Sequence, residues 1–123
     1  MSKISTADLV AAGIQPNLLD SLSHQINKTA VDKGFWTEPE FLDKVAGKLA
    51  LVHSEVTEVL EALRKSQGTD KVTEEFADIF IRCLDLYKVL VDNGYADQGL
   101  EEVIKAKMVT NDARPPKHGH VWG

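Results

Sequence analysis

Two pairs of acidic residues are the part of this sequence best suited to chemistry. Glu55 and Glu58 stand three residues apart, and Glu75 and Asp78 repeat that spacing further along the chain. Residues three apart share one face of a helix, so two antiparallel helices would bring all four carboxylates together. Converging carboxylates repel one another unless a cation lies among them. The pattern therefore favours a hard-metal site, with Mg²⁺ as the first choice.

The types of side chain available restrict which metal such a site would hold. Oxygen ligands suit Mg²⁺, Mn²⁺ or Ca²⁺. A di-iron site in a helical bundle uses Glu-x-x-His pairs, and no histidine in this sequence has a glutamate three residues before it. Zinc would require a cluster of cysteine and histidine, which is missing. A solvated acidic helix face stays open as the alternative, because single E-x-x-E pairs are common on exposed helices.

Cationic and amide side chains elsewhere in the chain offer a place for phosphate. Lys107, Asn111 and Arg114 occupy positions i, i+4 and i+7 of one helix face, and Lys48 stands seven residues before Glu55. The two lysines would neutralise phosphate oxygens and Asn111 would donate a hydrogen bond. Arg114 offers a bidentate fork. Each lysine, taken singly, is better explained as a solubilising surface residue.

Three further residues border these groups. Trp36, beside Phe35, is a candidate for stacking on a nucleobase, although a core or interface position explains it equally well. Glu61 continues the E-x-x-E spacing, but each step of three rotates about 60° around the helix, so Glu61 leaves the face of the first pair. Cys83 lies in an apolar stretch, which predicts a buried thiol in a reducing compartment.

The candidate ligands require helices to position them, and apolar periodicity supplies these. An all-α fold of four helices is expected, with no strand pattern and no internal repeat. A lead-in of 1–16 precedes a single domain of 17–123. Asn17 is expected to cap the first helix, and Thr37 with Glu40 forms a capping box for the second. The expected helices run over 17–33, 38–65, 69–92 and 97–112, the third starting between 69 and 73.

The expected inward faces follow the same periodicity. The third helix is apolar over so much of its circumference that it should be central or lie at a subunit interface. For the second helix the expected core positions are Leu49, Val52, Val56, Val59, Leu60 and Leu63, and for the fourth they are Leu100, Val103, Ile104 and Met108.

Size and composition set outer bounds on function. The chain has 123 residues, which fits one domain with a modest core that a second copy would help to complete. A net charge of -5 argues against a general nucleic-acid binder. The beginning of the chain lacks the apolar run of a signal peptide, and no stretch approaches a membrane span. A cytoplasmic protein is therefore expected.

Three stretches of the sequence resemble the MazG-like nucleoside triphosphate pyrophosphohydrolases. The resemblance covers about 25–119, and this all-α group also holds dimeric dUTPases, dCTP pyrophosphatases and phosphoribosyl-ATP pyrophosphohydrolase. The stretches are G-K-L-A-L-V-H-S-E-V-T-E-V-L-E-A-L-R-K, then E-E-F-A-D-I-F-I-R, then K-x-x-x-N-x-x-R-P-x-x-H-G.

This resemblance implies an activity, a metal and an assembly. Such enzymes hydrolyse the bond between the α and β phosphates, require Mg²⁺ or Mn²⁺, and form homodimers or homotetramers. The positions that match the metal ligands are Glu55, Glu58, Glu75 and Asp78. As a separate mechanistic hypothesis, Glu55 or Glu58 also serves as the general base. Those that match phosphate or nucleotide contacts are Lys107 and Asn111, with Arg114 at a further motif position. Two alternative functions stay open. One is an enzyme specific for a single nucleotide, such as dUTP, dCTP or dGTP, and the other is a non-catalytic helical interaction protein.

Overall fold

The computed structural model describes residues 17–36 and 41–116, including all of their side chains except those of 41–43. Within these residues the fold is helical throughout and contains no strand, which confirms the all-α prediction. The expected capping box at 37–40 lies outside the described residues, as do the lead-in of 1–16 and the tail of 117–123. The helices are α2 (Leu18–Asp32), α3 (Phe41–Arg64), α4 (Thr69–Asp92) and α5 (Leu100–Asp112).

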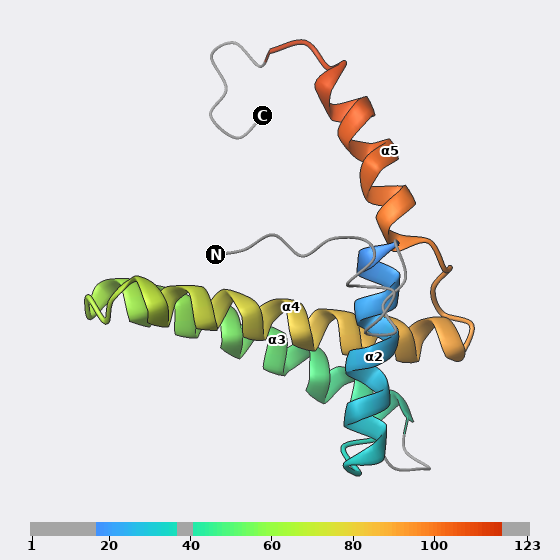
Figure 1. Ribbon diagram of the computed structural model, residues 1–123, viewed down its shortest axis with the longest axis horizontal. Coiled ribbons are helices and arrows are strands. Elements are labelled where there is room, and N and C mark those ends of the chain that lie inside the picture. Colours follow the sequence, from blue (N-terminus) through green and yellow to red (C-terminus); the bar gives the residue numbers. More distant parts are fainter. Residues whose placement is uncertain (1–16, 37–40, 117–123) are drawn as a thin grey trace, which may run out of the picture.

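Helices α3 and α4 run antiparallel and form a long arm (Figure 1). The tight connection between them includes Gly68, whose φ of 98° lies in a region that side chains with a Cβ rarely adopt. Helix α2 crosses α4 near the opposite end of the arm from this connection (Figure 1). Because α4 packs against both α3 and α2, it is the central helix, as its broad apolar surface predicted.

The buried core of the described chain is small. Its hydrophobic members are Val59 and Ala62 on α3, with Leu84, Leu86 and Val89 on α4. Helix α2 contributes buried polar residues instead, namely Ser21, Ser23 and Asn27. Buried polar groups are tolerated only when they are hydrogen-bonded, and the packing of α2 on α4 accordingly depends on specific polar contacts.

Helices α2 and α5 meet through reciprocal caps at their N-termini. Asp20 on α2 accepts hydrogen bonds from the backbone N–H groups of Gly99, Leu100 and Glu101, at 3.0–3.2 Å. Glu101 on α5 in turn accepts one from the backbone N–H of Leu19 at 3.1 Å. Each carboxylate satisfies otherwise unpaired N–H groups and faces the positive end of the other helix dipole. These caps attach the first turn of α5 to α2.

The prediction that Asn17 caps α2 is only half right. Asn17 occupies the N-cap position, but its side chain forms no capping hydrogen bond. The side-chain oxygen of Asn17 is buried without a hydrogen-bond partner among the described residues. A carboxylate from α5 takes the capping role, which no local pattern around position 17 could have indicated.

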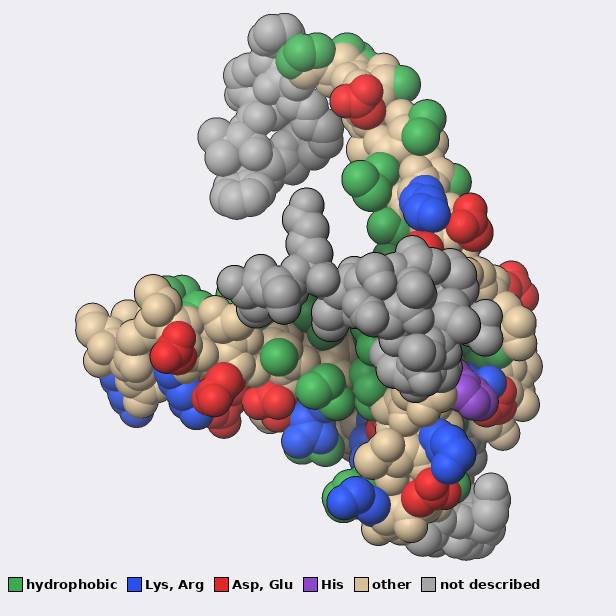
Figure 2. Space-filling view, viewed as in Figure 1, with side chains coloured by type: hydrophobic (Ala, Val, Ile, Leu, Met, Phe, Trp, Pro, Cys, Tyr) green, Lys and Arg blue, Asp and Glu red, His purple; other side chains and the backbone are tan. Residues whose placement is uncertain are grey.

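Many residues expected in the core are exposed in the single chain. The exposed members of the expected inward faces are Leu49, Val56, Leu60 and Leu63 on α3, and Val103, Ile104 and Met108 on α5. Cys83 is also exposed, so the prediction of a buried thiol is wrong for this chain. For the exposed residues of α3 and α5, the physical reason is that among the described helices α3 packs only on α4 and α5 only on α2, so each has one packed face. Figure 2 shows hydrophobic side chains along the projecting α5.

Among the described helices, none is both long enough and apolar enough to cross a lipid bilayer.

Candidate metal and phosphate site

Three of the four predicted carboxylate ligands converge between α3 and α4. Glu55 from α3 and Glu75 and Asp78 from α4 each place one oxygen within 4.8 Å of the others. We call these three residues the acidic cluster. Glu75 is buried, with 4% of its surface exposed, whereas Asp78 is open to solvent. The antiparallel packing of the two helices produces this convergence, as the repeated three-residue spacing predicted.

The fourth predicted ligand, Glu58, does not join the cluster. It is exposed and forms no hydrogen bond or ion pair with a described residue. It nevertheless lies within electrostatic reach of Lys71, whose pKa its charge helps to raise. The Lys71 ammonium is bound to Glu75, so a cation lies near the place where a fourth carboxylate was expected.

Two cations balance much of the charge of the acidic cluster. Lys71 Nζ lies 2.8 Å from Glu75 Oε1, and Arg82 Nε lies 2.7 Å from Glu55 Oε1. The hydrogen bond to Glu75, followed by the charge of Glu75, raises the pKa of Lys71 above its usual value of 10.5. Three carboxylates against two cations leave one formal negative charge. The cluster can thus form without a metal. A metal that binds there must compete with Lys71 and Arg82 for the carboxylate oxygens.

The acidic cluster still has the chemistry of a hard-cation site. Its members offer oxygen atoms alone, and no histidine or cysteine of the described residues joins them. Mg²⁺ is commonly held in proteins by one or two carboxylates while it keeps several waters. The exposed position of Asp78 leaves one side open for water or for a phosphate oxygen. The residues therefore fit a divalent cation, although they do not distinguish Mg²⁺ from Mn²⁺.

A pocket of about 270 Å³ begins at the acidic cluster and follows α4. Its lining consists of Phe35, Lys48, Asp78, Ile81, Arg82 and Asp85. Asp78 belongs to both the cluster and the pocket, so the pocket opens directly beside the cluster. Lys48, the predicted phosphate-binding lysine on α3, is part of this lining. We call this space the α4 pocket.

Trp36 and Lys48 lie together at the edge of the α4 pocket. Lys48 Nζ stands 4.8 Å from the centroid of the Trp36 ring and 5.9 Å from that of Phe35. These are cation–π distances. Trp36 itself is not part of the pocket lining, and its indole Nε1 donates to both oxygens of Asp85 at 3.0 Å. The aromatic ring that does line the pocket is Phe35.

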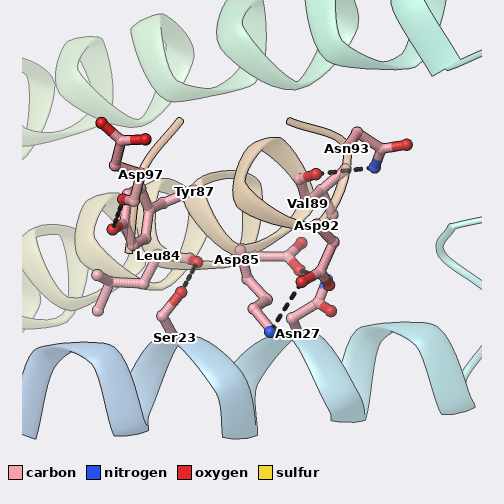
Figure 3. A network of polar contacts seen from close by, with 10 residues as sticks. Ser23, Asn27, Leu84, Asp85, Tyr87, Val89, Asp92, Asn93 and Asp97 are labelled. Atoms are coloured by element: carbon pink, nitrogen blue, oxygen red, sulfur yellow. Dashed lines mark hydrogen bonds and ion pairs between the residues drawn. The ribbon is translucent and has the colours of Figure 1, made fainter. Parts of the chain in front are cut away.

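A polar network from α2 supports the same end of the pocket. Asn27 Nδ2 donates to Asp85 Oδ1 at 2.8 Å, and Ser23 Oγ donates to the backbone carbonyl of Leu84. Figure 3 shows Ser23 and Asn27 directed from α2 toward α4. Both side chains are buried, so these bonds fix the position of α4 relative to α2.

The predicted phosphate-binding face on α5 does not reach this site within one chain. Lys107, Asn111 and Arg114 are all exposed. Helix α5 contacts α2 alone among the described helices and projects away from the arm (Figure 1). Lys107 and Asn111 lie one turn apart on α5 as predicted, whereas Arg114 follows the end of the helix. The direction of α5 separates all three from the acidic cluster.

Sequence reasoning missed three residues that the structure places at the site. Lys71 stands four residues before Glu75. Arg82 stands four residues after Asp78, and Asp85 stands seven residues after it. These are same-face helical spacings, so the periodic pattern contained the signal.

Comparisons of this chain with protein-family models, with curated proteins and with solved structures found no match.

Proposed function

We propose that this protein is a Mg²⁺-dependent nucleoside triphosphate pyrophosphohydrolase. It would hydrolyse the α–β bond of a (deoxy)nucleoside triphosphate to the monophosphate and pyrophosphate, in control of the nucleotide pool. The observation that carries the proposal is the convergence of Glu55, Glu75 and Asp78 beside a pocket lined by two cations. The MazG-like motifs of the sequence support the same activity.

In this proposal the acidic cluster holds the cation and the pocket holds the nucleotide. A divalent cation bound there would neutralise phosphate charge and lower the pKa of a bound water. Arg82 donates through Nε to Glu55, and its Nη groups form no hydrogen bond with the described residues. They are therefore available to a phosphate oxygen, as is the Nζ of Lys48.

The general base is proposed to be Glu58 in preference to Glu55. Glu55 already accepts a hydrogen bond from Arg82, so part of its acceptor capacity is taken. Glu58 stands one turn further along α3 and has no hydrogen-bond partner among the described residues. It is thus free to remove a proton from a water beside the acidic cluster.

A second copy of the chain is proposed to complete the site and cover the exposed apolar faces. Large hydrophobic side chains on α3, α4 and α5 are open to solvent, more than a stable single-chain domain usually leaves uncovered. In a homodimer or homotetramer these faces would be buried. The Lys107, Asn111 and Arg114 face of one copy could then approach the acidic cluster of another.

One specific observation supports a competing candidate, a non-catalytic helical interaction protein. Lys71 and Arg82 already pair with the cluster, so the carboxylates have a structural explanation that needs no metal. A panel of canonical (d)NTPs, assayed for pyrophosphate release with Mg²⁺, separates the two. We expect turnover that EDTA stops and added Mg²⁺ restores. Absence of turnover for every triphosphate would favour the interaction protein.

A further inference from the structure

Asp85 is a buried carboxylate at the end of the α4 pocket away from the acidic cluster. Only 9% of its surface is exposed, yet it belongs to the pocket lining. It stands seven residues after Asp78 on the same helix face, which corresponds to about 10 Å along the axis. A nucleoside with its phosphate at Asp78 spans a similar length. Asp85 is therefore placed where the base of a nucleotide would lie.

The hydrogen bonds of Asp85 leave it with unused acceptor capacity. Its Oδ1 accepts from Asn27 Nδ2 and Trp36 Nε1, and its Oδ2 shares the same Trp36 donor. A carboxylate offers about four acceptor positions, two on each oxygen. Among the described residues these three contacts fill both positions of Oδ1 and one of Oδ2. One acceptor position on Oδ2 remains for a ligand.

The surroundings hold Asp85 in that orientation. Asn27 and Trp36 come from α2 and the turn after it, and each donates to a fixed side of the carboxylate. An ionised carboxylate accepts hydrogen bonds and donates none. The end of the pocket is thus a rigid acceptor, flanked by the ring of Phe35 and the side chain of Ile81.

We propose that Asp85 is a specificity-determining residue that selects nucleobases bearing an exocyclic amino group. Cytosine, adenine and guanine present an amino donor that the free position of Asp85 can accept. Uracil and thymine carry a carbonyl oxygen where cytosine carries its amino group, and that oxygen would face a carboxylate. This inference rests on the proposed function, and it names the substrate class as amino-bearing nucleotides.

The sharpest test compares dCTP with dUTP, because the two bases differ at the exocyclic position in question. For the wild-type protein we expect kcat/KM for dCTP to exceed that for dUTP by at least about tenfold, as a charged hydrogen bond predicts. Equal values, or a preference for dUTP, would overturn the proposal. This comparison needs no variant, so a failure of any variant to fold does not affect it.

Asp85→Asn provides the second arm of the test. In this variant the amide oxygen can keep the bonds from Trp36 and Asn27, while the amide nitrogen donates to the ligand. The dCTP/dUTP ratio should therefore fall by at least about tenfold and move toward dUTP. Asp92→Asn is the matched control, an exposed carboxylate on α4 that pairs with Lys88. It should leave the ratio unchanged, and an unchanged ratio in a folded Asp85→Asn protein would overturn the proposal.

A binding measurement separates this proposal from the proposed function. In a Trp122→Phe background Trp36 is the one remaining tryptophan, so its fluorescence reports directly on the side chain bound to Asp85. Titration with dCMP and dUMP, without metal, should show at least about tenfold tighter binding of dCMP. If no triphosphate is turned over, the proposed function fails, and this titration alone tests the selectivity of Asp85 for amino-bearing bases. Equal affinities, or no response to either monophosphate, would then overturn the selectivity.

Discussion

The acidic cluster and the α5 face show two outcomes of the same kind of sequence pattern. Both consist of candidate functional side chains at helical spacing, and both were expected to meet at one site. The structure brings together three carboxylates of the first set. Lys107 and Asn111 stay exposed on α5, which contacts α2 alone among the described helices, and Arg114 is exposed just beyond the end of α5. Spacing within a helix is therefore a good guide to a shared face and a poor guide to what that face meets.

The reason for the difference lies in how each helix is attached. Helices α3 and α4 are joined by a tight turn and pack side by side, so their facing residues must meet. Helix α5 begins after a longer connection, and the carboxylates of Asp20 and Glu101 determine where its first turn lies. These caps point the rest of α5 away from the arm (Figure 1).

The largest expected effect is loss of activity on changing the acidic cluster. Asp78→Asn should lower pyrophosphate release by at least about 100-fold, because it removes a charged ligand beside the pocket. Glu61→Gln is the control on the opposing helix, since Glu61 pairs with Arg64 and Lys65 and lies outside the cluster. Full activity of a folded Asp78→Asn protein would show that the acidic cluster is not part of the active site.

A complementation experiment asks whether the two regions meet between copies of the chain. Lys107→Ala and Asp78→Asn should each be inactive alone if α5 of one copy serves the cluster of another. Unfolding and refolding the two variants as a mixture would form hetero-oligomers in which some sites contain neither change. We expect partial recovery of activity in the mixture. Activity of Lys107→Ala alone at the wild-type level would show that the α5 face takes no part.

A smaller effect is expected from the cations that balance the cluster. Lys71 and Lys88 each pair with a carboxylate four residues later on α4, at 2.8 and 2.9 Å, but Glu75 is buried and Asp92 is exposed. Lys71→Met should therefore lower the Tm clearly, whereas Lys88→Met should change stability by no more than about 0.5 kcal/mol.

Metal binding gives this pair of variants a second readout. Without Lys71, the charge of Glu75 lacks its partner, so Mg²⁺ should raise the Tm of Lys71→Met more than that of the wild type. Lys88→Met should respond to Mg²⁺ as the wild type does. If Mg²⁺ leaves the Tm of Lys71→Met unaltered, the cluster is a structural ion-pair network and holds no metal.

The smallest expected effect is a loss of stability in alkaline solution. Hydrogen bonding to Glu75 raises the pKa of Lys71, and hydrogen bonding to Glu101 raises that of Lys105, each from a usual value of 10.5. The folded protein then holds both protons more tightly than the unfolded chain. Their stabilisation is complete below pH 10.5 and is lost as the pH rises through the raised pKa values.

This alkaline loss also distinguishes the two regions. Lys71 pairs with a buried carboxylate on the arm, whereas one of the two partners of Lys105 on α5 is 69% exposed. The free energy of unfolding, measured with urea at neutral and at alkaline pH, should fall less in Lys71→Gln than in Lys105→Gln. The first variant lacks the stronger pair already at neutral pH, so it has less to lose. A smaller alkaline loss in Lys105→Gln than in Lys71→Gln would contradict this expectation. It would mean that the ion pairs of Lys105 on α5 stabilise the fold more than the ion pair of Lys71 does.

Much of the fold could be predicted because helix signals are local. Apolar periodicity and the breaks at glycine and proline placed the helix ends within about three residues of their positions in the structure, apart from the expected start at 38, which lies outside the described residues. The site was predicted in part, since Glu55, Glu75 and Asp78 converge and Glu58 stands apart. Asn27 and Trp36, which bind Asp85, come from 58 and 49 residues earlier in the chain, and no local pattern indicates such contacts.

The sequence by itself determined the helices, the shared faces of the carboxylate pairs and the hard-oxygen character of the acidic cluster. These depend on residue type and on a helical period that acts over a few residues. Only the tertiary structure decided that Lys71 lies near the place of the fourth carboxylate and that Asp85 closes the pocket. It also decided that α5 points away from the cluster, because helix packing and the reciprocal caps are contacts between distant residues.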